Sequence, residues 1–102
     1  MDNEIKALTE LNHPNIVKLY DVFRDSGYVY IVMEFCEYDL KEIIEKESFD
    51  ENRALNILTQ IAKGFKELNR RHIVHRDIKP ANILFSKGLF KIADFGLVKY
   101  IQ

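Results

Sequence analysis

Two carboxylates, an amide and an ammonium in the last third of the chain are spaced so that they could act together on a phosphate. Asp77 and Lys79 stand in a short loop, and Asn82 and Asp94 flank two apolar runs separated by residues 86–88 (Ser-Lys-Gly). Two such runs around a glycine-containing break predict a β-hairpin, whose two ends lie close together. The amide oxygen of Asn82 and the carboxylate of Asp94 should therefore converge. Such hard oxygen ligands suit Mg²⁺ together with a phosphate, which a nearby ammonium could also contact. The remaining carboxylate could act as a base for a hydroxyl.

The same stretch resembles the signatures of the protein kinase family. Residues 75–82 read His-Arg-Asp-Ile-Lys-Pro-Ala-Asn, and residues 94–96 read Asp-Phe-Gly. The family pattern is H-R-D-L-x-x-x-N followed by D-F-G, so Ile78 is a mild departure. Asp-Phe-Gly alone would be a weak match, whereas both motifs in order, joined by a hairpin of the right length, make a specific one. The resemblance implies an enzyme that transfers the γ-phosphoryl of ATP to protein hydroxyls with the help of Mg²⁺.

The resemblance gives each matching residue a role in that transfer. Asp77 would accept or orient the proton of the substrate hydroxyl, and Lys79 would contact the γ-phosphate. Asn82 and Asp94 would hold Mg²⁺. A lysine two residues after the aspartate is similar to the serine/threonine branch of the family rather than to the tyrosine branch. The implied partners are therefore ATP and a protein substrate, while the subfamily and any regulatory partner stay open.

Three further residues would be regulatory on the same resemblance. Glu4 matches the glutamate of the kinase helix C that pairs with a lysine on the third strand. Arg76 resembles the arginine that pairs with an activation-loop phosphate, and Phe95 would join the hydrophobic column that links the two lobes. Glu4 has an equally good interpretation as an exposed helix glutamate, because no lysine precedes it.

Residues 30–36 (Tyr-Ile-Val-Met-Glu-Phe-Cys) resemble the strand and hinge that hold adenine in kinases. Met33 would be the gatekeeper, and the backbones of Glu34 and Cys36 would form a hydrogen-bonding edge suited to a flat heterocycle. Without the resemblance, Met33 is core filler and Cys36 a small buried apolar residue. The full set of implied nucleotide contacts is Met33, Glu34, Cys36, Asp39 for the ribose and Leu84 for the floor beneath adenine. For Asp39, a plain helix N-cap is the simpler interpretation.

Hydrophobic periodicity and turn residues predict the elements that position these side chains. The expected elements are a helix over 2–12, strands over 15–23 and 28–35 joined by a turn at 24–27, a short helix over 39–47, a long helix over 50–71 and a short extended run over 97–101. The long helix should bury an apolar stripe made of Ala54, Leu58, Ile61, Ala62, Phe65 and Leu68. Gly64 within it suggests close packing, and the basic residues 70–72 fit a helix C-terminus better than a phosphate patch.

Composition limits the class of protein. The chain has 102 residues, 47% of them hydrophobic and 30% charged, with a formal net charge of −1. The scattered lysines and arginines argue against a nucleic-acid partner. The single cysteine permits no internal disulfide, and no signal peptide or membrane-spanning run is visible. We therefore expect no membrane partner and an intracellular location, cytoplasmic with the nucleus possible.

The expected fold is α+β and protein-kinase-like but partial. Residues 1–35 would be the remnant of the N-lobe, with helix C and a hairpin, and residues 36–102 the hinge and the start of the C-lobe. The four glycines cannot form a Gly-x-Gly-x-x-Gly loop, and the two prolines exclude an Ala-Pro-Glu motif. The sequence thus predicts a central fragment of a serine/threonine kinase domain, inactive in isolation. An inactive interaction module or decoy, and a truncated gene product, are the alternatives.

Overall fold

The computed structural model describes residues 9–72 and 79–93 of the chain. Its elements, in chain order, are β1 (Leu19–Asp25), β2 (Tyr28–Met33), β3 (Tyr38–Asp39), α2 (Leu40–Lys46), α3 (Glu51–Arg70), the 3₁₀ helix η1 (Pro80–Asn82), β4 (Ile83–Ser86) and β5 (Leu89–Ile92). They form two small antiparallel sheets, β1–β2 and β3–β4–β5. The α+β class expected from the sequence is confirmed. Most of the helix predicted over residues 2–12, and the run at 97–101, lie outside the described residues.

Both predicted hairpins are present, and their turns show why. Ser26 and Gly27 connect β1 to β2 with φ angles of 52° and 82°. Lys87 and Gly88 connect β4 to β5 with φ angles of 53° and 81°. Two central residues with positive φ make the turn type whose twist matches that of the flanking strands, and glycine takes its second position without steric cost. The turn chemistry read from the sequence therefore sets the register of both hairpins.

The strand predicted over residues 15–23 begins only at Leu19. The residues before it instead bond to β5, because Ile92 N–H donates to Asn15 O at 2.9 Å and Val17 N–H donates to Ile92 O at 2.9 Å. The apolar, β-branched composition of this segment is typical of a strand, but its backbone groups are satisfied by a distant part of the chain. This contact places the start of the β1–β2 hairpin against β5.

The side chain of Asn15 strengthens the same contact and is almost fully buried, at 4% exposed. Its amide nitrogen donates to Phe90 O at 2.9 Å and to Gln60 Oε1 at 3.2 Å. Gln60 Oε1 also accepts from Phe90 N–H at 2.8 Å. A buried amide costs free energy unless it is hydrogen-bonded, so this network stabilises one specific docking of three segments. No local sequence pattern indicated this role for Asn15 or Gln60.

The helix N-cap predicted at Asp39 is confirmed, and Asp50 caps the longer helix in the same way. The Asp39 carboxylate accepts from Glu42 N–H at 2.8 Å at the start of α2. The Asp50 carboxylate accepts from Arg53 N–H at 2.7 Å at the start of α3. Each bond satisfies one of the backbone donors that a helix N-terminus leaves without a partner.

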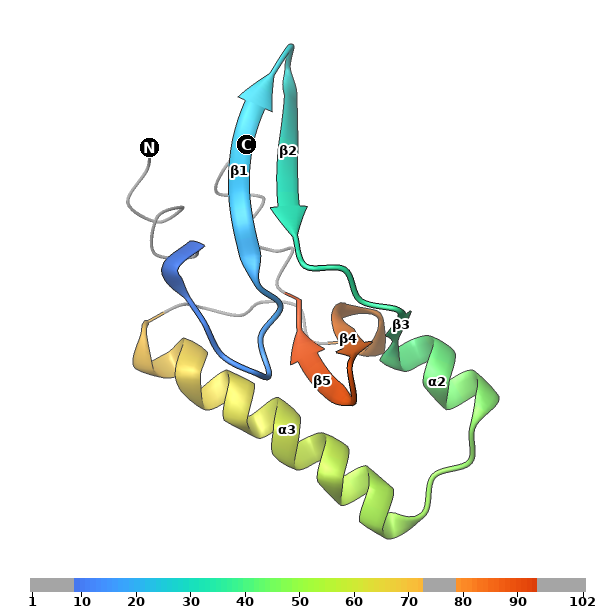
Figure 1. Ribbon diagram of the computed structural model, residues 1–102. Helices are drawn as coiled ribbons and strands as arrows, with labels where there is room; N and C mark the ends of the chain where they lie inside the picture. The colour runs from blue at the N-terminus through green and yellow to red at the C-terminus, as the bar shows by residue number, and fades with distance from the viewer. Residues whose placement is uncertain (1–8, 73–78, 94–102) are drawn as a thin grey trace.

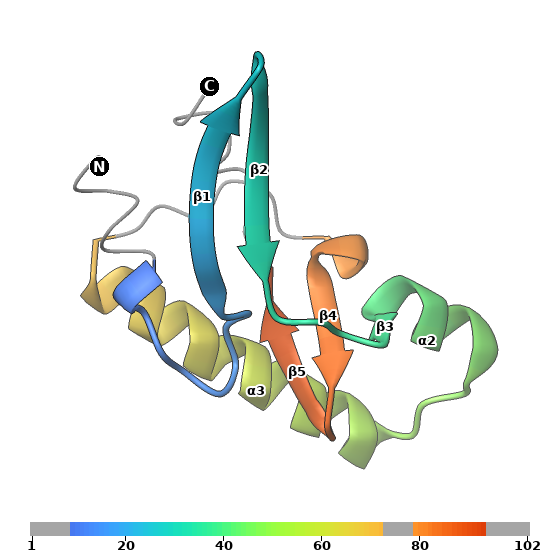
Figure 2. The same ribbon diagram turned by 45° about the horizontal axis from the view of Figure 1, so that its top comes forward.

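The buried face of α3 is rotated from the predicted one. Its buried residues are Ile57, Gly64 and Leu68, with Ile61 and Phe65 partly buried against the core. Leu58 is instead 61% exposed, and Ala62 is also exposed. Periodicity alone allowed a wide apolar stripe, and the position of β5 decides which edge of that stripe is covered. In Figures 1 and 2, β5 lies over the middle of α3.

Gly64 is the position where α3 approaches its neighbours most closely, as the sequence suggested. A Cβ atom added there would lie 2.6 Å from Asn15 O and 2.8 Å from Ile92 Cδ1. The first of these atoms belongs to the backbone and cannot move aside cheaply, so the helix tolerates its low helical propensity in exchange for this packing.

The side chains of the β4–β5 hairpin alternate between two faces, because successive side chains of a strand point to opposite sides. Ile83, Phe90 and Ile92 are buried and belong to the core cluster, against which Phe85 packs. Leu84 and Lys91 pair across the two strands on the opposite face. This second face is the one that carries the candidate site. Within the described ranges, no helix is long and apolar enough to cross a membrane.

Candidate nucleotide and metal site

Three paired strands place in one row the residues predicted to contact the ribose and to lie beneath adenine. Asp39 on β3 pairs with Leu84 on β4, and Leu84 pairs with Lys91 on β5. Directly paired residues lie on the same face of a sheet, so these three side chains share the face opposite the core. The structure therefore brings together two residues that the sequence separates by more than forty positions. Asp39 also caps α2, which occupies one of its two carboxylate oxygens.

The ends of the β4–β5 hairpin meet as predicted. Ala93 N–H donates to Asn82 O at 2.8 Å, and Asn82 N–H donates to Lys79 O at 2.8 Å. Asn82 is half-buried, whereas Lys79 is exposed at the N-terminus of η1. Asp94 follows Ala93 directly in the chain but lies outside the described residues. The hairpin geometry is confirmed, and the pairing of Asn82 with Asp94 on one metal stays a prediction.

The segment between β2 and β3 presents only part of the backbone edge predicted from the sequence. Glu34 N–H already donates to Lys18 O at 2.9 Å, so Glu34 can offer a ligand its carbonyl but not its N–H. Within residues 9–72 and 79–93, no hydrogen bond engages the Glu34 carbonyl or the backbone of Cys36. Met33 ends β2 opposite Leu19 and is partly buried. The usable edge is therefore one carbonyl from Glu34 and both backbone groups of Cys36.

The side chain of Glu34 joins the two sheets. Its carboxylate accepts from Lys18 N–H at 2.8 Å and from Lys91 Nζ at 3.0 and 2.9 Å. The side chains of Lys91 and Glu34 are only 13% and 19% exposed. Burial by itself would raise the pKa of Glu34, but the Lys18 N–H and the Lys91 ammonium together lower it below the usual 4.5.

A family model of the protein kinase domain matches residues 1–102. The chain belongs to the protein kinase family. It is 42% identical over 102 residues to cell division control protein 2 homolog 3 of Trypanosoma brucei brucei, covering 97% of this chain and 33% of that protein. It is also 42% identical to serine/threonine-protein kinase atg1 of Dictyostelium discoideum, covering 100% of this chain and 17% of that protein.

The fold is similar to that of a solved kinase structure. A crystal structure of Rad53 in complex with AMP-PNP matches 92% of this chain with a TM-score of 0.85 and 38% sequence identity. The partial kinase-like fold expected from the sequence is thereby confirmed, whereas its division after residue 35 stays a prediction. The match covers 27% of the Rad53 chain, and the chain spans a third or less of the two curated relatives.

Several predicted kinase residues lie outside the described residues, and their roles stay predictions. These are Glu4, Arg76, Asp77, Asp94 and Phe95. In the part of the chain that the structure describes, no three His, Cys, Asp or Glu side chains gather as a metal site. The magnesium hypothesis therefore depends on Asn82, whose position the structure gives, and on Asp94, whose position it does not.

Lys91 was not among the residues predicted from the sequence, although its position carried a signal. A lysine in the middle of the apolar run 89–93 (Leu-Phe-Lys-Ile-Ala) needs a partner when the strand is covered on both faces. The partner, Glu34, lies 57 positions away, so no local pattern could have identified it. Burial, with the nearby Glu34 carboxylate, raises the pKa of the Cys36 thiol, so this thiol is not activated as a nucleophile.

The stability that the Glu34–Lys91 pair contributes to this chain should be lost in acid. The folded pKa of Glu34 lies below 4.5, so the stability it contributes is present above about pH 4.5 and is lost as the pH falls through the folded value. The difference in unfolding free energy between wild type and Lys91→Met should therefore be largest near about pH 6 and shrink below about pH 4.5. Urea unfolding across this range measures it, with Lys63→Met, on the exposed face of α3, as a control that should show no such trend.

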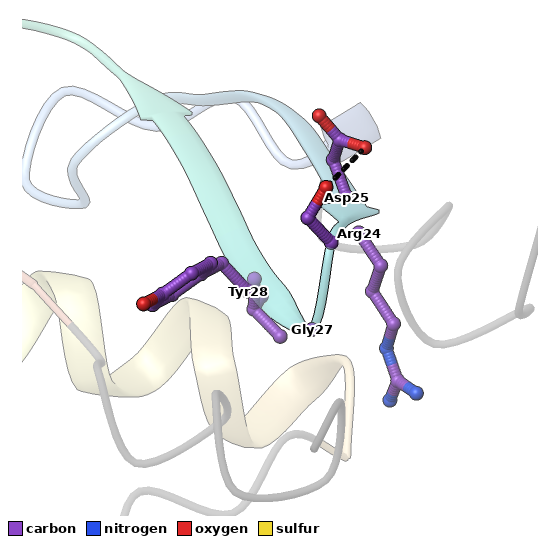
Figure 3. A pocket seen from close by; sticks show the side chains of 6 residues that line it. Arg24, Asp25, Gly27 and Tyr28 are labelled. Atoms are coloured by element: carbon purple, nitrogen blue, oxygen red, sulfur yellow. Dashed lines mark hydrogen bonds between the residues drawn. The ribbon is translucent and has the colours of Figure 1, made fainter.

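A separate hollow lies at the tip of the β1–β2 hairpin (Figure 3). It has a volume of about 270 Å³ and is lined by residues 24–29. In Figure 3 the side chains of Arg24 and Tyr28 point away from each other, and Ser26 Oγ donates to Asp25 Oδ1 at 3.3 Å. None of the predicted nucleotide or metal residues lines it, so we do not assign it to the kinase chemistry.

Proposed function

We propose that this chain forms the nucleotide-binding and metal-binding centre of a serine/threonine protein kinase. The observation that carries the proposal is the pairing of Asp39 with Leu84 on one face of the sheet, beside the segment that contains Glu34 and Cys36 and bonds to β4. The apolar side chain of Leu84 near a backbone edge fits a flat base such as adenine. The printed names of the curated relatives, which include a serine/threonine-protein kinase and a cyclin-dependent kinase, support the same chemistry.

The proposed reaction transfers the γ-phosphoryl of ATP to a protein serine or threonine. The substrate oxygen forms a bond to the γ-phosphorus while the bond from that phosphorus to the ADP oxygen breaks. Asp77 accepts or orients the hydroxyl proton, and Lys79 contacts the γ-phosphate. Asn82 and Asp94 supply oxygen ligands, a donor set that fits Mg²⁺, whose charge offsets that of the phosphates. The meeting of the hairpin ends at Asn82 and Ala93 supports this pairing.

The chain contains no glycine-rich loop and no lysine before Glu4, so we expect it to transfer phosphate poorly by itself. Kinases reach about 1–100 s⁻¹ because several groups act together on one phosphate. Parts that act as a unit are strongly non-additive, and their loss removes most of the rate rather than a share of it.

Radiolabelled ATP with serine, threonine and tyrosine peptides tests the proposal. We expect little transfer by the chain alone, and transfer to serine or threonine by a longer version that adds the missing kinase segments from a relative. Transfer to tyrosine only would contradict the serine/threonine assignment. A longer version that binds ATP but transfers nothing would favour the alternative of an inactive interaction module.

A further inference from the structure

The Glu34–Lys91 pair occupies the point where the segment after β2 crosses the β4–β5 hairpin. We propose that Lys91 is a positioning residue which, through Glu34, aims the Glu34 carbonyl so that the site selects adenine over guanine nucleotides. The inference rests on the proposed function, because it concerns the same nucleotide site. It extends that function to a side chain that touches no nucleotide itself.

Glu34 is held on every side except at its carbonyl. Its N–H donates to Lys18 O at 2.9 Å, and its carboxylate accepts from Lys18 N–H at 2.8 Å. Lys91 Nζ binds both carboxylate oxygens, at 3.0 and 2.9 Å. These bonds fix the amide and the side chain of one residue at the same time. The direction of its carbonyl is then determined by the remaining backbone angle.

The residues after Glu34 restrict that remaining angle. Ser86 Oγ donates to Phe35 O at 3.4 Å, and Glu37 N–H donates to Phe85 O at 3.1 Å. The segment is therefore tied to β4 at two points and to β5 through Lys91. Among the described ion pairs, Glu34–Lys91 is the one that connects the two sheets.

Lys91 also ties the segment to the floor of the site. It lies directly across from Leu84 on the same face of the hairpin. A shift of the Glu34 carbonyl relative to Leu84 would therefore require the ion pair to stretch or break. Losing one partner of a largely buried pair leaves the other charge without compensation, and the remaining carboxylate would be drawn towards water.

The chemical consequence is a difference between purine bases. Adenine carries an amine at its six-position, which donates a hydrogen bond to a carbonyl. Guanine carries an oxygen there, which would face the carbonyl as a second acceptor. A site built around a fixed polar group rejects a base that leaves the group unpaired, and a loosely held group loses that discrimination.

The test compares the wild-type chain with Lys91→Met and with Lys91→Arg. Dissociation constants for Mg-ATP, Mg-GTP and Mg-tripolyphosphate are measured by amide NMR titration, which follows weak binding. We expect Lys91→Met to lower the preference for ATP over GTP by about tenfold, the worth of one hydrogen bond, with tripolyphosphate binding unchanged. Lys91→Arg should keep most of the preference, because a guanidinium can bind both oxygens of Glu34. Lys63→Met is the matched control.

The outcomes separate this inference from the proposed function. A wild type that binds neither ATP nor GTP overturns the proposed nucleotide site and the positioning role with it. A wild type that prefers ATP, with Lys91→Met keeping that preference, overturns the positioning role alone. If Lys91→Met weakens the binding of ATP, GTP and tripolyphosphate equally, its effect is merely structural, and this result also overturns the positioning role. If Lys91→Met fails to fold by circular dichroism, the double variant Glu34→Gln with Lys91→Met takes its place under the same criteria, because it removes the ion pair without leaving a buried charge uncompensated.

Discussion

Replacing Phe90 with alanine is expected to lower the free energy of unfolding by about 3–5 kcal/mol. Phe90 is 2% exposed, and its ring packs against that of Phe85 with centroids 4.8 Å apart. It also lies on the core face of β5, against α3. The truncation removes transfer free energy and leaves a cavity that the surrounding backbone cannot collapse to fill. Small domains are stable by only about 5–15 kcal/mol, so this one change should remove a large share.

Urea unfolding followed by circular dichroism measures this effect as a lower midpoint at an unchanged slope. Phe35→Ala is the matched control, because the same truncation occurs at a side chain that is 82% exposed. That control should change the unfolding free energy by no more than about 0.5 kcal/mol. Equal losses of unfolding free energy in the two variants would show that the packing of β5 on α3 is not the main core of this chain.

Replacing Asp77 with asparagine is expected to slow phosphate transfer by about 10²–10⁴-fold in the longer, active version of the kinase. An amide has nearly the size of the carboxylate but cannot accept the proton of the substrate hydroxyl. The affinity for ATP should change little, because the proposed contacts to Mg²⁺ and to adenine belong to other residues. A lower turnover at a constant KM for ATP is therefore the expected signature.

The matched control for this change is Asp25→Asn, at the exposed end of the β1–β2 hairpin. It makes the same chemical substitution far along the chain from the loop that carries Asp77 and should leave the rate unaltered. Radiolabelled phosphate transfer to a serine peptide, measured at several ATP concentrations, separates an effect on turnover from an effect on the KM for ATP. Full activity of Asp77→Asn would contradict the assignment of Asp77 as the base.

Local features of the fold were predictable because short-range chemistry determines them. Gly27 and Gly88 allow the positive φ of the two hairpin turns, and Asp39 and Asp50 satisfy backbone donors of the helices they precede. Each of these effects acts within about four residues. The kinase motifs were recognisable for a similar reason, since their residues stand at fixed short spacings.

The tertiary structure decided everything that depends on which distant segments meet. Asn15 to Lys18 resembles a strand by composition, yet Asn15 and Val17 bond to β5 instead of extending β1. Leu58 belongs to an apolar stripe by periodicity, yet it is exposed because β5 covers a neighbouring edge of α3. Burial depends on what lies opposite a face, and periodicity describes only the face itself.

The candidate site also has features that were predictable from the sequence and features that only the tertiary structure decided. By itself the sequence determined the types and spacing of the chemical groups, including the ends of the β4–β5 hairpin that bring Asn82 next to Ala93. Only the tertiary structure showed that Glu34 has its N–H engaged, and that its carboxylate is bound to Lys91. Such a pair forms because two partly buried charges from separate sheets must compensate each other, and that requirement exists only once the sheets have packed together.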